Sequence, residues 1–194
     1  MVKVAGVDEA GRGCLAGPVF SAAVILNDNI ETKDIKDSKK ISFKKRILLS
    51  EYIKKNSIYA VGLSSVEEIN KINILNASLL SMQRALLKLK PKPSVAYIDG
   101  VFAPKDVNIK CKTFIKGDEK IICIAAASIV AKTARDLFMI NLDKKYPKYG
   151  WGKNFGYGTA EHLYNLKKYG ITKHHRKKFK PVYNILMKNK RETL

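Results

Sequence analysis

The chain has 194 residues, 46% of them hydrophobic, which is enough to bury the core of one domain and too little for several. No apolar run approaches the roughly 18 to 20 residues that a membrane-spanning helix needs, and no signal-peptide core follows Met1, so we expect a cytoplasmic protein. The 37 basic residues against 17 acidic ones leave a net charge of +20, which predicts a polyanionic partner such as nucleic acid.

The excess of basic residues has a second explanation besides nucleic-acid binding, and the cysteines show no pattern of a disulfide or zinc site. Lysine far outnumbers arginine, and isoleucine and asparagine are abundant, a pattern that genomic base composition also produces. Cys14, Cys111 and Cys123 are widely spaced, with no CxxC pair and no Cys/His cluster of zinc type. We therefore expect reduced thiols.

The first part of the chain predicts two strands, a helix and a third strand. Residues 2–7 and 18–26 are apolar and β-branched, and a glycine-rich turn at 11–13 separates them, so an antiparallel or mixed pair begins the sheet. Ser42 can cap a helix whose apolar positions recur at helical spacing up to Ile53. Residues 58–63 then predict the third strand.

The second part alternates helices and strands. Ser65 and Glu68 form a capping-box pattern at the start of a helix whose apolar face continues to Leu89. Strands are expected at 95–98 and 109–114, and a long alanine-rich helix at 121–146, which Pro147 ends.

Residues 148–194 form the least regular part of the chain. They mix glycine, aromatic and basic residues before a last helix around 183–190. Because strands and helices alternate along the chain, we expect a layered α/β fold. Residues 1–194 are expected to form a single domain, with 148–194 as a C-terminal extension that has too few apolar residues for its own core.

Four carboxylates stand where strand ends and a helix start can bring them together. Asp8 and Glu9 end the first strand, Asp99 ends the strand at 95–98, and Asp118 precedes the long helix. On neighbouring strands these acids would repel one another, and hard divalent cations would relieve the repulsion. Adjacent strand residues face opposite sides, so Asp8 and Glu9 share a site only if the strand twists or ends between them. Taken singly, each acid is equally explained as a cap, a turn residue or a solvated charge.

Seven motifs follow one another along the chain: VDEAGRG at 7–13, LAGPV at 15–19, DSKK at 37–40, YIDG at 97–100, KGD at 116–118, AASIVAK at 126–132 and GYGT at 156–159. In this order they resemble bacterial ribonuclease HII, far more specifically than DEAGRG alone would. The resemblance implies a ribonuclease H-like fold, a mixed sheet of about five strands flanked by helices, with a helical C-terminal extension that binds substrate. It also implies an endonuclease that hydrolyses RNA in RNA–DNA hybrids and incises 5′ of ribonucleotides embedded in DNA, leaving 3′-hydroxyl and 5′-phosphate ends.

By this resemblance the catalytic and metal-binding residues are Asp8, Glu9, Asp99 and Asp118, and the cofactor is Mg²⁺ or Mn²⁺. Two ions about 3.5 to 4 Å apart would clamp the scissile phosphate, and this two-ion arrangement is a hypothesis. Asp136 is also acidic, but its place inside the long helix favours a structural role.

The resemblance also suggests residues that bind substrate. Gly11, Arg12 and Gly13 would approach the ribose and an adjacent phosphate, although a plain tight turn is the alternative. Tyr157 resembles the tyrosine that packs on the sugar at an RNA-to-DNA junction, and its alternative is a half-buried aromatic under a loop. Contacts to the nucleic-acid backbone are expected from Lys39, Lys40, Ser128, Lys132, Arg176 and Lys177.

Histidines and several departures from the family pattern complete the comparison. His162 and His175 are similar to family positions, yet either is equally explained as a packing or loop residue. Cys14 and Gly158 stand where the family usually has proline, Asn70 where aspartate is common and Lys178 where serine is usual. None of these departures removes a catalytic acid, while Gly158 predicts a less rigid loop and a less sharp junction preference.

Partners and alternative identities follow from the same comparison. The partners implied are RNA–DNA hybrids and DNA duplexes containing ribonucleotides, with no membrane, and a monomer is expected. A sliding clamp stays an open partner, since residues 188–194 show no clear clamp-binding pattern. Type III ribonuclease H is disfavoured because its additional N-terminal domain is not seen here, and a non-catalytic basic protein would not need all four acids.

Overall fold

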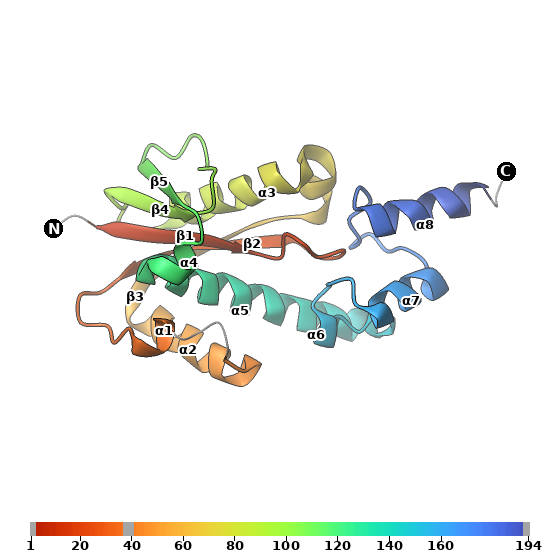
Figure 1. Ribbon diagram of the computed structural model, residues 1–194, viewed down its shortest axis with the longest axis horizontal. Helices are drawn as coiled ribbons and strands as arrows, with labels where there is room; N and C mark the ends of the chain where they lie inside the picture. Colours follow the sequence, from red (N-terminus) through yellow and green to blue (C-terminus); the bar gives the residue numbers. More distant parts are fainter. Residues whose placement is uncertain (1–2, 37–40, 192–194) are drawn as a thin grey trace.

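The computed structural model describes residues 3–36 and 41–191, which are arranged around a five-stranded mixed sheet (Figure 1). The sheet order is β3-β2-β1-β4-β5; β2 pairs antiparallel with β1 and β3, while β4 pairs parallel with β1 and β5. The expected α/β fold with a mixed sheet is confirmed. The strands are β1 (Val4–Ala10), β2 (Val19–Leu26), β3 (Ser57–Ser64), β4 (Val95–Asp99) and β5 (Lys110–Phe114).

The helices include the four that the sequence predicts and several shorter ones. The predicted helices are α2 (Phe43–Lys55), α3 (Val66–Lys88), α5 (Ile122–Lys145) and α8 (Lys180–Arg191). The segment 148–169 contains more helix than expected, because its helices are short: α7 has ten residues and α6 has four. The additional elements are α1 (Lys33–Lys36), α4 (Gly117–Lys120), the 3-10 turn η2 (Pro147–Tyr149), α6 (Trp151–Asn154) and α7 (Ala160–Tyr169).

Side-chain caps fix where the predicted helices begin. The Ser42 hydroxyl accepts the Lys45 amide at 3.4 Å at the start of α2. At α3, Ser65 Oγ accepts the Glu68 amide at 3.2 Å and the Glu68 carboxylate accepts the Ser65 amide at 2.8 Å, so the predicted capping box is confirmed. One residue of α3, Asn73, has a left-handed φ of 67° and kinks the helix.

Helices cover both faces of the sheet (Figure 1). On one face, Met82 and Leu86 of α3 and the capping residue Leu89 pack against the strands, and on the other face α5 and α2 do so. At Gly6 the backbone of α5 lies so close to β1 that a Cβ would overlap the backbone of Cys123. The position of α5 across β1 therefore depends on glycine at this point.

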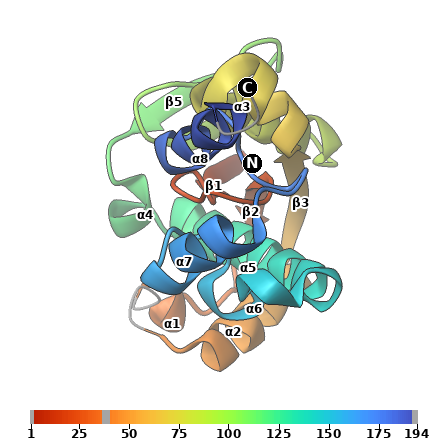
Figure 2. The same cartoon turned by 90° about the vertical axis from the view of Figure 1, so that its right-hand side faces the viewer.

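The C-terminal helices lie at the end of the sheet toward which β1 runs (Figures 1 and 2). Trp151, Leu166 and Val182 join a core with Leu15 of the β1–β2 connection and Met139 of α5. Residues 148–182 thus bury their apolar side chains against the body of the sheet domain. None of the described helices is long and apolar enough to cross a bilayer.

Candidate active site

Asp8 and Asp99 lie next to each other at the ends of β1 and β4. The parallel register pairs Val4 with Val95 and runs to Val7 with Ile98, so the next two positions are the aspartates. Val7 and Ile98 are both buried beneath α3, and the residue after each therefore faces the other side of the sheet. Both carboxylates thus point to the α5 side from adjacent strands.

Asp8 is almost fully enclosed, with 6% of the residue exposed. Its carboxylate accepts the Glu9 amide at 2.7 Å and a hydrogen bond from the Ser128 hydroxyl of α5. Burial raises the pKa of Asp8 well above its ordinary value, the charges of Glu9 and Asp99 raise it further, and the Ser128 bond opposes them. Ser128, which was expected at the nucleic-acid backbone, here contacts a predicted catalytic acid.

Glu9 lies on the opposite face of β1 from Asp8, because the strand continues through Ala10 without ending between them. Its carboxylate pairs with Arg12 at 3.1 Å. Burial raises the pKa of Glu9, the Arg12 guanidinium lowers it and the charge of Asp99 raises it again. Glu9 and Asp99 also line one cavity of about 150 Å³, and the charge of Asp99 raises the pKa of both Asp8 and Glu9.

Asp118 is tied to the other acids through its neighbour. The Gly117 amide donates to Asp99 Oδ1 at 2.7 Å, and a Cβ at Gly117 would lie 2.7 Å from Ile124 Cδ1. Asp118 is half-buried in the short helix α4, directly after this anchor. The KGD motif therefore supplies both an acid and the amide that orients Asp99.

The four acids do not form a closed ligand shell. Among residues 3–36 and 41–191, no three carboxylate, thiol or imidazole groups are placed to hold one ion. The expectation that the four acids share a metal site at one rim of the sheet stays a prediction: β1 sends Asp8 and Glu9 to opposite faces, while Asp99 lies near both. The groups still fit a hard divalent cation, since they are oxygen donors and the raised pKa of Asp8 reflects a buried charge that a cation would stabilise.

The two glycines of the predicted substrate turn differ in their surroundings. Gly11 has a φ of +98°, and a Cβ there would overlap the Arg135 side chain, so packing alone explains this glycine. A Cβ at Gly13 would meet nothing within 4 Å, which leaves its surface open to a ligand. Between them, the Arg12 side chain is 51% exposed.

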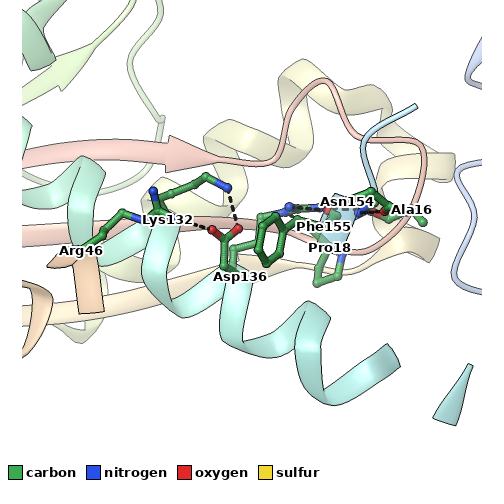
Figure 3. A network of polar contacts seen from close by, with 9 residues as sticks. Ala16, Pro18, Arg46, Lys132, Asp136, Asn154 and Phe155 are labelled. Atoms are coloured by element: carbon green, nitrogen blue, oxygen red, sulfur yellow. Dashed lines mark hydrogen bonds and ion pairs between the residues drawn. The ribbon is translucent and has the colours of Figure 1, made fainter. Parts of the chain in front are cut away.

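Two buried arginines hold the β1–β2 connection in place. Arg135 donates to the carbonyls of Ala16, Pro18 and Phe155 at 2.9 to 3.1 Å. These three acceptor residues are labelled in Figure 3. Sequence reasoning did not single out Arg135, whose only signal is an arginine within an alanine-rich helix face.

Arg176 is the second of these arginines, and its expected role is corrected. It is fully buried and donates to the carbonyls of Arg12, Gly17 and Pro18 at 2.8 to 3.3 Å. Its donors are directed at the protein backbone, so the predicted phosphate contact is replaced by a structural one. The adjacent Lys177 is exposed.

Tyr157 lies among basic and polar side chains and is 40% exposed. Lys132 Nζ lies 5.5 Å from the centre of its ring, and the Cys14 thiol shares a hydrogen bond with its hydroxyl. Cys14 is fully buried, so the residue that replaces the usual proline touches the predicted sugar-packing tyrosine.

Asp136 is fully buried and pairs with two basic side chains, of which Lys132 lies beside Tyr157 (Figure 3). It pairs with Lys132 at 2.6 Å and with Arg46 at 2.9 Å, which agrees with a structural role. Lys39 and Lys40 lie outside the described residues. Cys14, Cys111 and Cys123 are free thiols, as expected.

Comparison with known proteins supports one family. A family model described as Ribonuclease HII matches residues 5–182. A ribonuclease HII of Pelagibacter ubique is 57% identical over 96% of this chain and 100% of that protein, and one of Roseobacter denitrificans is 45% identical over 97% and 95%.

Solved structures show the same fold. The ribonuclease H2 of Pyrococcus horikoshii has a TM-score of 0.82 at 28% identity, covering 97% of this chain and 99% of that one. Bst-RNase HIII in complex with Mn²⁺ has a TM-score of 0.80 at 19% identity, covering 98% and 71%, and this likeness concerns the fold alone. On the family model and the relatives together, the chain belongs to the ribonuclease HII family.

Proposed function

We propose that this chain is an endoribonuclease that hydrolyses RNA in RNA–DNA hybrids and incises duplex DNA on the 5′ side of an embedded ribonucleotide. Membership of the ribonuclease HII family supports this activity. The observation that carries the proposal is the pair of neighbouring carboxylates, Asp8 and Asp99, at the ends of two parallel strands. The enzyme is proposed to act as a monomer.

Asp8, Glu9, Asp99 and Asp118 would hold Mg²⁺ or Mn²⁺, with phosphate and water oxygens as further ligands. When bound, such a cation polarises the scissile phosphate and acidifies a water molecule. The Ser128 hydroxyl and the Glu9 amide orient Asp8, and the Gly117 amide orients Asp99. These groups keep the carboxylates in one rotamer, which reduces the entropy lost on binding.

Selection of a ribonucleotide requires contact with its 2′-hydroxyl. Gly13 leaves space for the sugar to approach the backbone, and the exposed Arg12 can reach an adjacent phosphate. Tyr157 would pack on the neighbouring sugar, and the position of Lys132 beside its ring supports this role. Further phosphate contacts are proposed for Lys39, Lys40 and Lys177.

A panel of four duplexes of one base sequence tests the proposal: RNA–DNA, DNA with one ribonucleotide, DNA–DNA and RNA–RNA. We expect cleavage of the first two with Mg²⁺ or Mn²⁺, none of the last two, and none in EDTA. Mapping of the ends should give a 3′-hydroxyl and a 5′-phosphate at a cut 5′ of the ribonucleotide. Binding of all four duplexes without cleavage of any would indicate a non-catalytic nucleic-acid-binding protein.

A further inference from the structure

Three buried rings lie behind Tyr157 and are used by none of the steps above. Trp151, His162 and His175 are each fully buried. Trp151 Nε1 lies 3.0 Å from His162 Nε2, and the Nε2 atoms of the two histidines are 3.3 Å apart. His162 Nδ1 lies 2.8 Å from the carbonyl oxygen of Tyr157, so this cluster ends on the backbone of the predicted sugar-packing residue.

The partners of the two rings determine where their protons lie. A carbonyl can only accept, so His162 Nδ1 carries a proton and donates it to Tyr157. His162 Nε2 is then the acceptor for the Trp151 N–H, which is donor only. At the other ring, the Thr172 amide donates to His175 Nδ1 at 3.0 Å, which leaves the proton of His175 on Nε2.

With these tautomers every hydrogen bond of the cluster has one donor and one acceptor atom. His175 Nε2–H donates to His162 Nε2, and this contact is longer than the Trp151 bond because the two donors share one lone pair. A second proton on His162 would face the N–H groups of Trp151 and His175. Burial accordingly lowers the pKa of His162, and burial with the neighbouring His162 and His174 rings lowers the pKa of His175 to about 3.

We infer that His162, with its tautomer fixed by Trp151 and His175, is a positioning residue that holds the backbone of Tyr157 and thereby sets the preference for an embedded ribonucleotide. This inference rests on the proposed function. The start of segment 154–159 is held by bonds from the Tyr157 amide to the Asn154 carbonyl at 2.9 Å and from the Gly156 amide to Asn154 Oδ1 at 2.8 Å. Arg135 also donates to the Phe155 carbonyl at 2.9 Å, and the Leu15 amide donates to the Gly156 carbonyl at 2.8 Å. The Tyr157 carbonyl itself accepts the Thr159 amide at 2.9 Å in addition to His162 Nδ1. The Thr159 bond stays within the loop, whereas the His162 bond ties the Tyr157 carbonyl to the buried rings of Trp151 and His175.

Two substitutions of His162 separate positioning from general stability. Asparagine places an amide N–H near the position of Nδ1 and can still donate to Tyr157, while glutamine places its amide near Nε2 and can accept from Trp151 and His175. His162→Gln thus keeps the interior contacts and loses Tyr157, and His162→Asn does the reverse. His174→Asn is the control, since that ring contacts Tyr146 and Trp151 on the side of the cluster away from the His162–Tyr157 bond.

The measurement is kcat/KM on a duplex with one ribonucleotide divided by kcat/KM on a uniform RNA–DNA hybrid. We expect His162→Gln to lower this ratio about tenfold, equivalent to about 1.4 kcal/mol, and His162→Asn and His174→Asn to change it less than about twofold. An unchanged ratio in His162→Gln, or equal losses in the Asn and Gln variants, would overturn the inference. If the wild-type chain cuts neither duplex, the proposed function itself fails.

Nitrogen NMR of the imidazole rings tests the same inference without a substitution. The native protein should show His162 protonated at Nδ1 and His175 protonated at Nε2 at neutral pH. Protonation of His162 at Nε2 would contradict the inference even if the variants failed to fold, because that tautomer cannot donate to Tyr157.

Discussion

At the residue scale, Asp8 shows how an uncompensated buried charge lowers stability. Because burial raises its pKa, the folded state binds the Asp8 proton more tightly than the unfolded state does. The resulting stability is fully present below the unfolded pKa near 4 and is lost as the pH rises through the higher folded value. In EDTA at pH 7.5, Asp8→Asn should therefore gain about 1 kcal/mol, or roughly 2–4 °C in Tm, and lose hybrid cleavage. Thermal melts check this: the gain should vanish near pH 4, and a gain of equal size at both pH values would refute the account.

Substitutions of the neighbours Arg176 and Lys177 should affect different properties, stability for Arg176 and nucleic-acid binding for Lys177. Arg176→Met removes the donors to three buried carbonyls and should cost about 3 kcal/mol or more in the free energy of unfolding. Lys177→Ala should leave stability unchanged and reduce the slope of log K against log salt for hybrid binding by about one. Denaturant melts measure the first effect and salt titrations of binding measure the second. An Arg176→Met protein that is as stable as the wild type but has a reduced salt slope would support the phosphate contact instead.

The sequence could predict that Asp8, Glu9 and Asp99 lie toward the ends of two strands, because acids directly follow apolar runs there. It could not predict that β1 continues through Ala10. The burial of Arg176 could not be predicted either, since its acceptors lie more than 150 positions away along the chain. The same holds for the contact between Cys14 and Tyr157. Roles that depend on local pattern were predictable, and roles that depend on distant carbonyl groups were not.

At the element scale, the turn between β1 and β2 combines a packed glycine with an open one. Gly11→Ala should destabilise the protein by about 2 kcal/mol or more, because it has a positive φ and its Cβ would overlap Arg135. Gly13→Ala should melt within about 0.5 kcal/mol of the wild type yet cleave more slowly, if the sugar approaches this backbone. Melting curves and cleavage rates of both variants decide this, and full activity in Gly13→Ala would exclude that approach.

Helix starts were predictable where a side chain caps them, as at Ser42 and Ser65. Helix α7 was not predicted, although Thr159 accepts the His162 amide at 3.2 Å, because it has only ten residues and lies in a stretch rich in glycine, aromatic and basic residues. The kink at Asn73 also left no recognisable pattern in an otherwise regular helical face.

At the scale of the whole molecule, acids from β1, β4 and α4 occupy one end of the β1–β4 pair in a chain of net charge +20. Divalent metal should raise the Tm of the native protein, because it binds the folded state and relieves repulsion between carboxylates that are distant in sequence. The increase with saturating Mg²⁺ or Mn²⁺ should be smaller for Asp99→Asn. Differential scanning measures both proteins, and identical increases would argue against a shared metal site.

The layered fold was predictable from the alternation of strands and helices, but the sheet order β3-β2-β1-β4-β5 was not, because it depends on pairings between distant segments. The opposite facing of Asp8 and Glu9 followed once β1 proved to continue through Ala10.

Cleavage of a duplex with one ribonucleotide by Asp99→Asn, beside the wild type and the exposed control Asp28→Asn, tests the account most directly. The two substitutions remove the same charge, at the β4 end and in a distant loop. We predict that Asp99→Asn loses at least about a hundredfold in rate at saturating metal while Asp28→Asn cuts like the wild type. Cutting by Asp99→Asn at the wild-type rate would contradict the claim that the acids ending β1 and β4 form the catalytic centre.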